Sequence, residues 1–485
     1  MNPSPRCAGV LLHVTSLPGG PVGDLGASAY RFVDWLAAAG QSVWQVLPLV
    51  PAAGDGSPYS GVSSVAGNPL LIAVPGESAR GPARVDFAAA WRAKEPRLRG
   101  MVEELHRDQA ERRAFDEFTG RQRDWLDDYA LFRALADRHG AVMGWPEELR
   151  RRDPSALRRA AAELADEVRF HQTAQLLFDR QWQALRRYAR DRGVRIAGDM
   201  AFYVSQHSAD VWAHPELFAV DPATLALQGV GGVPPDAFSE TGQRWGVPVY
   251  AWAAHAADGY RWWLQRMAKT AEQVDVVRID HFRGFESFWN VPGDAPTAAS
   301  GAWIPGPGRE LFDAIRSAGG APEIWAEDLG EITPAVEALR DQLGLPGMRV
   351  LQFAFDESGG ANIHLPFHHP QECVVYTGTH DNDTVLGWWT SSNAARKERV
   401  RRYLGRMRRA RVPGALVRMA YGSVARHAVV PLQDLLGLSG RARMNLPGTV
   451  SPTNWSWRAA PGAFTRRRAR ALAGLAADYG RLPAP

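Results

Sequence analysis

The chain has little of what marks a secreted, membrane-spanning or disulfide-stapled protein. It contains only Cys7 and Cys373 in 485 residues, too few for a disulfide framework, although one bond between them stays open at this stage. No run of about eighteen apolar residues occurs, which excludes a membrane-spanning helix. The amino terminus lacks the charged segment and long apolar run of a secretion signal. We therefore expect a cytoplasmic protein with reduced thiols and no membrane partner.

Lysine is also scarce, because Lys94, Lys269 and Lys397 are the only ones and the net charge of +4 rests on arginine. The densest basic run, residues 396–411, has apolar side chains at positions 400, 403, 404 and 407. This spacing predicts an amphipathic helix whose arginines face solvent. No nucleic-acid-binding motif accompanies the run, so we expect no nucleic-acid partner.

Eight short apolar segments, rich in β-branched residues, predict the strands of a parallel sheet that helices cover. They span residues 9–14, 43–49, 194–200, 274–280, 322–327, 348–355, 373–378 and 427–432. Helical patterns separate most of them, for example at residues 29–39, 260–270, 333–343 and 397–408. The alternation of strand and helix predicts an α/β fold, a (β/α)₈ TIM barrel that makes residues 1–485 a single catalytic domain.

Two intervals are longer than such a barrel needs. Residues 50–193 begin with a loop rich in Gly, Pro and Ser, then become helical and charged, and end in an amphipathic stretch at 155–192 with Gly193 as a stop signal. We expect a mainly helical insertion subdomain there. Residues 214–252, rich in Gly, Pro and aromatics, are expected to form an active-site loop over one barrel face. The tail after the NWSW segment, residues 454–457, is too short for a C-terminal β-sandwich.

Acidic residues follow three of the predicted strands, where barrel enzymes place catalytic groups. Asp280 shares a strand face with Arg278, whose charge favours the anion that a nucleophile needs. Glu327 follows Trp325 on the next strand, and a carboxyl among aromatics and other carboxylates stays protonated, as a general acid must. The structural alternatives are an Arg278–Asp280 ion pair and, for Glu327 with Asp328, an acidic pair that caps the following helix.

The third position is Asp381, which is crowded by His380, Asn382 and Asp383. Such crowding is unusual for structure alone. A metal site is the alternative, although the chain has no HxH or HExxH arrangement, and the histidines at 364, 368 and 369 lack partners at ligand spacing.

The positions of Asp280 and Glu327 suit a retaining glycosidase. Adjacent strands lie about 4.8 Å apart, and such enzymes hold two carboxyls roughly 5–5.5 Å apart. Loop aromatics support a sugar substrate, because the faces of Tyr59 and Trp245 suit the C–H-rich faces of pyranose rings. The residues alone therefore favour an enzyme that acts on a glycosidic bond.

These motifs, taken together, resemble one known family over nearly the whole chain. They are GVLLH (9–13), TSLP (15–18), WQVLPL (44–49), SPY (57–59), AGNP (66–69), GVPPD (232–236), GQRWG (242–246), RIDHFRG (278–284), AEDLG (326–330), GM (347–348), THDNDT (379–384), PLQDLLG (431–437), RMNLPG (443–448) and NWSWR (454–458). The chain is similar to the amylomaltases, the 4-α-glucanotransferases (disproportionating enzymes) of the α-amylase clan. That family is a (β/α)₈ barrel without the C-terminal β-domain of amylases and uses no organic cofactor.

The resemblance implies a role for each carboxyl: Asp280 as nucleophile, Glu327 as general acid and then base, and Asp381 as stabiliser of the distorted substrate. It implies that segments of α-1,4-glucans, including maltooligosaccharides, pass to the 4-hydroxyl of another glucan or of glucose. By resemblance, Arg278 and His380 hold the donor sugar. The remaining substrate-binding residues that it implies are Ser57, Tyr59, Asp236, Trp245 and Asn454.

Some positions depart from the family pattern, namely Ala201, His207, Ala237 and Val247. They leave the subsite affinities and the acceptor preference open, but not the reaction type. The rival functions are an α-glucan hydrolase with the same carboxyls, a catalytically silent glycan-binding protein and a metal-dependent hydrolase.

Overall fold

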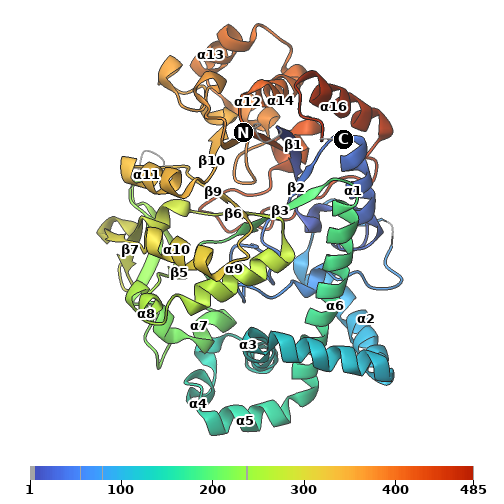
Figure 1. Cartoon of the computed structure of the whole chain (residues 1–485), viewed down its shortest axis with the longest axis vertical. Coiled ribbons are helices and arrows are strands. Elements are labelled where there is room, and N and C mark those ends of the chain that lie inside the picture. Colours follow the sequence, from blue (N-terminus) through green and yellow to red (C-terminus); the bar gives the residue numbers. More distant parts are fainter. Residues whose placement is uncertain (1–5, 55, 79, 236–238, 484–485) are drawn as a thin grey trace.

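The computed structural model describes residues 6–54, 56–78, 80–235 and 239–483 (Figure 1). Its central sheet has eight parallel strands in the order β10-β11-β12-β1-β2-β3-β6-β9. They are β1 (Cys7–Leu11), β2 (Val43–Gln45), β3 (Arg195–Met200), β6 (Val276–Ile279), β9 (Glu323–Ala326), β10 (Gly347–Val350), β11 (Cys373–Tyr376) and β12 (His427–Pro431). Each strand overlaps one predicted segment, in order, so the prediction of a (β/α)₈ barrel is confirmed.

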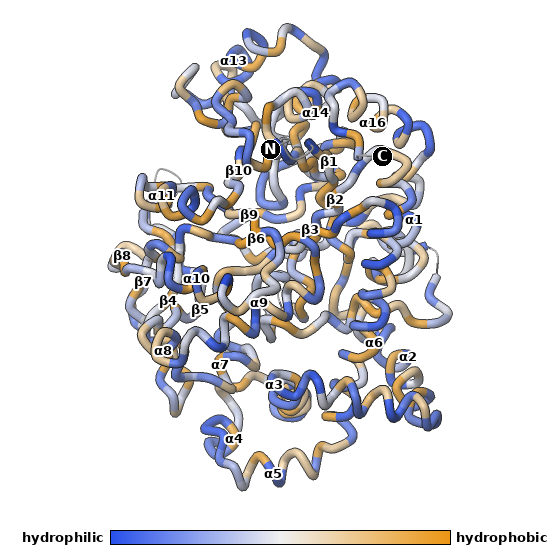
Figure 2. Tube along the Cα trace, in the orientation of Figure 1, coloured by the Kyte–Doolittle hydropathy of each residue, from blue (hydrophilic) through white to orange (hydrophobic). Residues whose placement is uncertain are grey.

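The two ends of the sheet meet and close the barrel. The amide of Ala326, at the end of β9, donates to the carbonyl of Pro346 directly before β10 at 2.9 Å. The amide of Met348 in β10 donates to the carboxylate of Asp328 at 2.6 Å. Hydrophobic residues dominate the central strands (Figure 2), as expected for strands that pack against the barrel interior on one face and helices on the other.

The outer helices are α1 (Ala27–Ala38), α9 (Arg261–Gln273), α10 (Arg309–Ala318), α11 (Pro334–Leu343), α12 (Val385–Ser391), α14 (Val412–Gly422) and α16 (Arg466–Asp478). α16 packs against α1 and α14, which brings the last described helix beside the first one (Figure 1). None of the described helices combines the length and the apolar character needed to cross a bilayer. The helix predicted at 397–408 is α13 (Ala394–Leu404); it ends early because Gly405 adopts φ +81°.

Five helices lie between β2 and β3 and form the lower part of the molecule in Figure 1. They are α2 (Phe87–Arg107), α3 (Gln109–His139), α4 (Glu147–Arg150), α5 (Pro154–Glu163) and α6 (Ala165–Arg190). The predicted stretch 155–192 is two helices that part at Leu164, and the backbone beyond them turns at Gly193 with φ +69°. The guanidinium of Arg186 in α6 pairs with Asp275 at 2.9 Å, which anchors this segment to the barrel.

A second, antiparallel sheet with the order β5-β4-β7-β8 lies beside the barrel. Its strands are β4 (Gly229–Val233), β5 (Gln243–Pro248), β7 (Ser287–Pro292) and β8 (Ala302–Pro305). The prediction of a loop over residues 214–252 is wrong in this respect, because β4 and β5 are strands. β4 has the sequence GVGGV, and a strand rich in glycine is hard to predict because glycine disfavours strands. Its partner strand β7 is also distant in sequence, since it follows β6.

Candidate active site

A chain of ion pairs joins the carboxyl ends of β3 and β6. Arg278 is only 4% exposed, and its Nη1 lies 2.8 Å from both carboxylate oxygens of Asp199. Its Nη2 lies 2.9 Å from Oδ1 of Asp280, which confirms that Arg278 and Asp280 share a strand face. Although burial opposes the charge, the carboxylates of Asp199 and Asp280 raise the pKa of Arg278. Asp280 therefore faces a permanent cation, while 30% of its side chain stays open to solvent.

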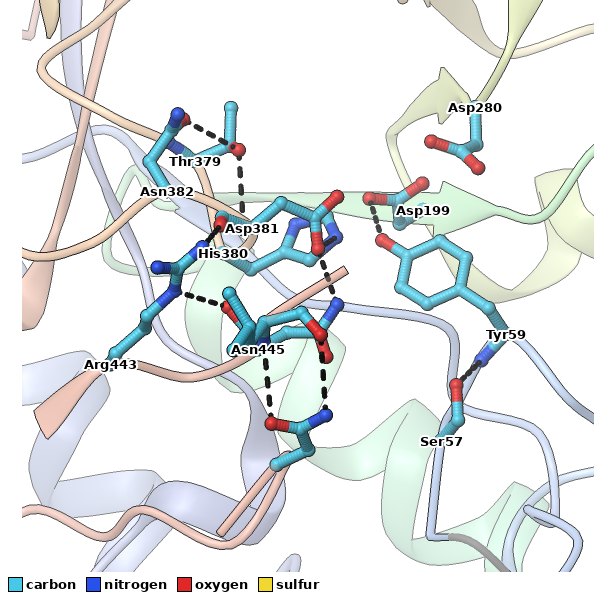
Figure 3. Close-up of polar contacts among 12 residues, drawn as sticks. Ser57, Tyr59, Asp199, Asp280, Thr379, His380, Asp381, Asn382, Arg443 and Asn445 are labelled. Carbon is cyan, nitrogen blue, oxygen red and sulfur yellow. Dashed lines mark hydrogen bonds and ion pairs between the residues drawn. The ribbon is translucent and has the colours of Figure 1, made fainter. Parts of the chain in front are cut away.

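The loop after β2 delivers Tyr59 to this ion-pair chain. Its hydroxyl donates to Oδ2 of Asp199 at 2.8 Å (Figure 3). Its ring stacks on His380, with 5.1 Å between the centroids, and lies 5.7 Å from the ring of Trp455. Ser57 supports the loop, because its hydroxyl accepts a hydrogen bond from the Tyr59 amide at 3.2 Å. The residues form an aromatic wall beside the carboxylates.

Glu327 follows β9, the strand next to β6. Its Oε2 accepts from the amide of His281 at 2.8 Å, and its Oε1 accepts from the amide of Leu329 at 2.8 Å. Since His281 directly follows Asp280, the two carboxyls belong to the same wall of the barrel mouth. Burial and the charge of Asp280 raise the pKa of Glu327 to about 8, so its neutral acid predominates at pH 7.

The surroundings of Glu327 differ in two ways from the sequence-based expectation. The indole of Trp325 donates to Glu323 at 3.1 Å, one layer nearer the amino-terminal end of the barrel. The raised pKa of Glu327 has burial and the charge of Asp280 as its causes, which confirms the expected neighbouring carboxylate. The capping alternative is wrong as well, because Thr333 caps α11 while Asp328 pairs with Arg340 of α11 and Arg349 of β10.

Asp381 lies in the loop after β11, with 44% of its side chain exposed. Oδ1 accepts from the amide group of Asn445 at 2.6 Å and lies 3.4 Å from Nε2 of His380. Arg443 donates to the backbone carbonyls of Asp381 and Asn445, each at 2.6 Å. In Figure 3 the carboxylate points toward the side on which Asp199 and Asp280 lie. The loop is thus fixed while the carboxylate stays accessible.

The remaining predicted sugar contacts are placed in different ways. Trp245 in β5 is 37% exposed and meets the ring of His281 edge-on at 5.0 Å, so the second sheet reaches the catalytic wall. The side chain of Asn454 instead binds its own loop, through the Leu446 amide at 3.3 Å and the Thr449 carbonyl at 3.0 Å. Asp236 lies outside the described residues.

Among the departures from the family pattern, Ala201 accepts a hydrogen bond through its carbonyl from buried Arg266. His207 is exposed, Val247 is half-buried in β5, and Ala237 lies outside the described residues.

Sequence reasoning missed three residues of the site. Asp199 is the second-last residue of the predicted strand 194–200, and Asp280 is the last of the predicted strand 274–280, so the same strand-end criterion finds it. Asn445 and Arg443 follow no strand, and nothing in their local sequence shows that they reach Asp381.

In the part of the chain that the structure describes, the side chains that could bind a metal ion together lie outside the candidate active site. One set of three side chains, Asp137, Glu167 and His171, is close enough to hold an ion. Arg133 pairs with Asp137 at 3.3 Å and Arg99 pairs with Glu167 at 2.9 Å, so cations of the protein already serve both carboxylates. The histidines at 364, 368 and 369 make hydrogen bonds to the Val350 amide of β10, the Gly360 carbonyl and the Ser423 hydroxyl, respectively. Cys7 and Cys373 are free thiols.

The sequence model of the 4-alpha-glucanotransferases matches residues 12–463. The chain belongs to this family. A 4-alpha-glucanotransferase of Thermus thermophilus is 46% identical over 502 residues, covering 99% of each chain. The chloroplastic/amyloplastic 4-alpha-glucanotransferase of Solanum tuberosum is 44% identical, covering 98% of this chain and 87% of that one. The resemblance inferred from the motifs is confirmed, and the chain is an enzyme of the 4-alpha-glucanotransferase class.

Solved structures agree with the family. Amylomaltase from Streptococcus agalactiae in complex with acarbose superimposes with a TM-score of 0.94 at 34% identity, covering 98% of this chain and 99% of that one. Amylomaltase from Corynebacterium glutamicum has a TM-score of 0.77 at 18% identity, covering 98% and 75%, which shows the shared fold.

Proposed function

We propose that this transferase moves a segment of an α-1,4-glucan to the 4-hydroxyl of another glucan or of glucose, with retention and through a covalent bond to Asp280. The observation that carries the proposal is the contrast between two neighbouring carboxyls. Asp280 is paired with the Arg278 cation, whereas burial and Asp280 raise the pKa of Glu327 to about 8. An anion beside a neutral acid is the pair that retaining glycosyl transfer requires.

In the first step the Asp280 carboxylate attacks the anomeric carbon, and the departing glycosidic oxygen takes the proton of Glu327. In the second step Glu327, now a carboxylate, removes the proton from the acceptor 4-hydroxyl. The acceptor oxygen then attacks the anomeric carbon and releases Asp280. Glu327 regains its proton, so both groups return to their starting states.

The surrounding residues bind and orient the donor sugar. Asp381, exposed and held by Asn445 and Arg443, accepts hydrogen bonds from hydroxyls of the distorted ring. Arg278 acts by holding Asp280 and Asp199 in register. Tyr59 and His380 offer a stacked aromatic surface to the sugar face.

The other binding residues shape the subsites from loops. Ser57 and Asn454 act by fixing the loops that carry Tyr59 and Trp455. Trp245 lines the acceptor side, since it contacts the residue after Asp280. Asp236 remains a substrate-binding residue by the family resemblance.

Two insertions adapt the barrel to transfer. Residues 214–252 form the active-site insertion that shields the covalent intermediate from water, so that an acceptor sugar reacts first. Residues 50–193 form the helical subdomain that supports the Tyr59 loop. We propose a cytoplasmic enzyme that needs neither a metal nor an organic cofactor.

Incubation with maltotriose tests the function. Transfer yields glucose together with maltopentaose and longer chains, while the total number of reducing ends stays constant. Maltose and glucose with rising reducing ends would instead identify a hydrolase. The Asp280→Asn variant must lose this product pattern. Excess chelator must leave the rate unchanged, since inhibition would restore the metal-dependent alternative.

A further inference from the structure

The floor of the barrel, at the amino-terminal ends of the strands, holds a cluster of ionisable side chains that glycosyl transfer does not use. Cys7 begins β1 and is in register with His427, the first residue of β12. The Cys7 sulfur lies 3.0 Å from Nδ1 of His427. Nε2 of the same ring lies 3.4 Å from Oε1 of Glu323 in β9. β12 and β9 are not neighbours in the sheet, so this line of three side chains crosses the barrel interior.

Further contacts fix the orientation of the line. Arg195 in β3 pairs with Oε2 of Glu323 at 2.8 Å. The indole of Trp325 donates to Oε1 of Glu323 at 3.1 Å, and its ring lies 4.9 Å from that of His427. His427 is only 1% exposed, whereas Cys7 is partly exposed. A buried imidazole, 3.4 Å from a carboxylate, therefore faces the sulfur of a residue that is partly exposed.

A thiol, a hydrogen-bonded imidazole and an orienting carboxylate form the arrangement that activates cysteine nucleophiles. Burial raises the pKa of the Cys7 thiol, but the hydrogen bond and charge of His427 outweigh it, with help from Arg195 and Arg481. The pKa of Cys7 therefore lies below its ordinary value. Burial lowers the pKa of His427, and its bonds to Cys7 and Glu323 raise it above its ordinary value.

The other cysteine is a built-in contrast. Cys373 is fully buried, its sulfur donates to the Pro370 carbonyl at 3.1 Å, and burial raises its pKa to about 12. The chain thus combines one thiol arranged for reaction with one arranged for packing.

We propose that Cys7 is a modification site, a thiolate that small peroxides oxidise to a sulfenic acid at the floor of the barrel, opposite the glucan-binding mouth. The sulfur attacks one peroxide oxygen, an S–O bond forms and the O–O bond breaks. Sulfur gives up two electrons and the peroxide is reduced. With hydrogen peroxide, the departing hydroxide takes the proton of the His427 imidazolium and leaves as water. Glu323 and Arg195 hold the ring in place throughout.

The test treats the full-length enzyme with hydrogen peroxide and the sulfenic-acid trap dimedone, and follows labelling of each cysteine by peptide mass spectrometry. The thiolate fraction of an ordinary thiol rises roughly 80-fold from pH 6 to pH 8. We expect the labelling rate of Cys7 to rise clearly less than this over the same range, because the pKa of its thiol is lowered. Cys373 should stay unlabelled.

The matched variants are His427→Asn and, as a control, His207→Asn at an exposed histidine. His427→Asn should slow Cys7 labelling at pH 6 about tenfold or more, whereas His207→Asn should not change it. Unchanged transferase activity and an unlabelled Cys373 show that each variant is folded. A rise near 80-fold in the wild-type enzyme, no label on Cys7, or equal rates in folded His427→Asn would each overturn the proposal. The wild-type pH profile decides alone if His427→Asn fails to fold.

Discussion

Asp280 and Glu327 are chemically similar side chains that lie in different surroundings. Asp280 lies 2.9 Å from a guanidinium and keeps a third of its surface in water. Glu327 is withdrawn from water and faces the Asp280 charge, with two backbone amides that only partly compensate. The hydrogen bond from the His281 amide to Glu327 keeps the two carboxyls on the same wall of the barrel mouth. The chemistry is thus set by contacts within a few residues of each carboxyl.

The pKa of Glu327 sets the alkaline limit of activity. The first step needs the protonated acid, which predominates below pH 8 and is lost as the pH rises through that value. We expect kcat/KM for maltotriose to fall about tenfold per pH unit above pH 8. Circular dichroism at each pH, with recovery of activity at pH 7, separates titration from unfolding. An alkaline limb centred below pH 6 would remove Glu327 as the acid.

Asp199 supports the site indirectly, through its contacts with Arg278 and Tyr59. Asp199→Asn leaves the Arg278 guanidinium buried with one partner, and breaking a buried ion pair costs about 3–5 kcal/mol of folding free energy. We also expect kcat to fall about a hundredfold, as misplaced catalytic groups typically cause. Thermal unfolding and steady-state kinetics measure both effects.

Tyr59→Phe is the matched control for Asp199→Asn. It removes only the 2.8 Å hydrogen bond to Asp199, worth about 1 kcal/mol. Similar losses of stability in the two variants would show that the ion pair is unimportant.

At this scale the sequence locates the three carboxyls because each follows a recognisable strand. It does not show that Asn445 supports Asp381, since 64 residues separate them. The pairing of Asp199 with Arg278 depends on the register of β3 against β6, which short apolar runs do not specify.

At the scale of elements, the second sheet brings an aromatic side chain to the catalytic wall of the barrel mouth. β4 pairs with β7, although β6 lies between them in the chain. This pairing holds the second sheet beside β6, where Trp245 on β5 contacts His281. The barrel strands could be predicted because eight short apolar runs separated by helices leave few other folds. β4 and β5 could not, because a glycine-rich strand acquires its structure from a distant partner. The predicted helix 397–408 runs four residues past the end of α13 at Leu404, because its apolar spacing continues beyond Gly405.

Gly232 in β4 permits the close approach of β5. A Cβ at this position would overlap the carbonyl oxygen of Gln243, and such overpacking costs about 1–3 kcal/mol. Because β5 carries Trp245, Gly232→Ala should raise the KM for maltotriose and increase hydrolysis relative to transfer. Product analysis at equal conversion measures this ratio.

Gly462→Ala provides the comparison, since no atom lies within contact distance of the added Cβ. We expect its stability to change by less than about 0.5 kcal/mol and its product ratio to match the wild type. An unchanged ratio of hydrolysis to transfer in Gly232→Ala would show that the second sheet does not select the acceptor.

For the whole molecule, the carboxyl-terminal end of the barrel (the mouth) and its amino-terminal end (the floor) have different roles. The mouth gathers carboxyls and aromatics from the loops after β2, β6, β9 and β11, whereas the floor joins the first and last parts of the chain. Arg481, fully buried beyond α16, donates to the carbonyls of Cys7, Tyr421, Ser423 and Ala425. A residue close to the end of the described chain therefore joins the start of β1 to the segment between α14 and β12.

Arg481→Met should destabilise the fold without changing the reaction. It leaves several buried carbonyls without a donor, and we expect a loss of about 3 kcal/mol or more, seen as a lower thermal midpoint. Arg470→Met, at an exposed position on α16, should leave the midpoint unchanged. The kcat at 25 °C should stay within about twofold of wild type in both. A large fall in kcat without a change in midpoint would contradict this separation of floor and mouth.

The covalent aspartyl intermediate is the central claim, and trapping it is the most direct test. Glu327→Gln cannot deprotonate an acceptor, but α-maltosyl fluoride needs no acid to release fluoride, so the first step proceeds and the second stalls. Peptide mass spectrometry of this variant should find a maltosyl group on the peptide that contains Asp280. A sugar on any other residue, or turnover to product of inverted configuration without an adduct, would contradict the mechanism.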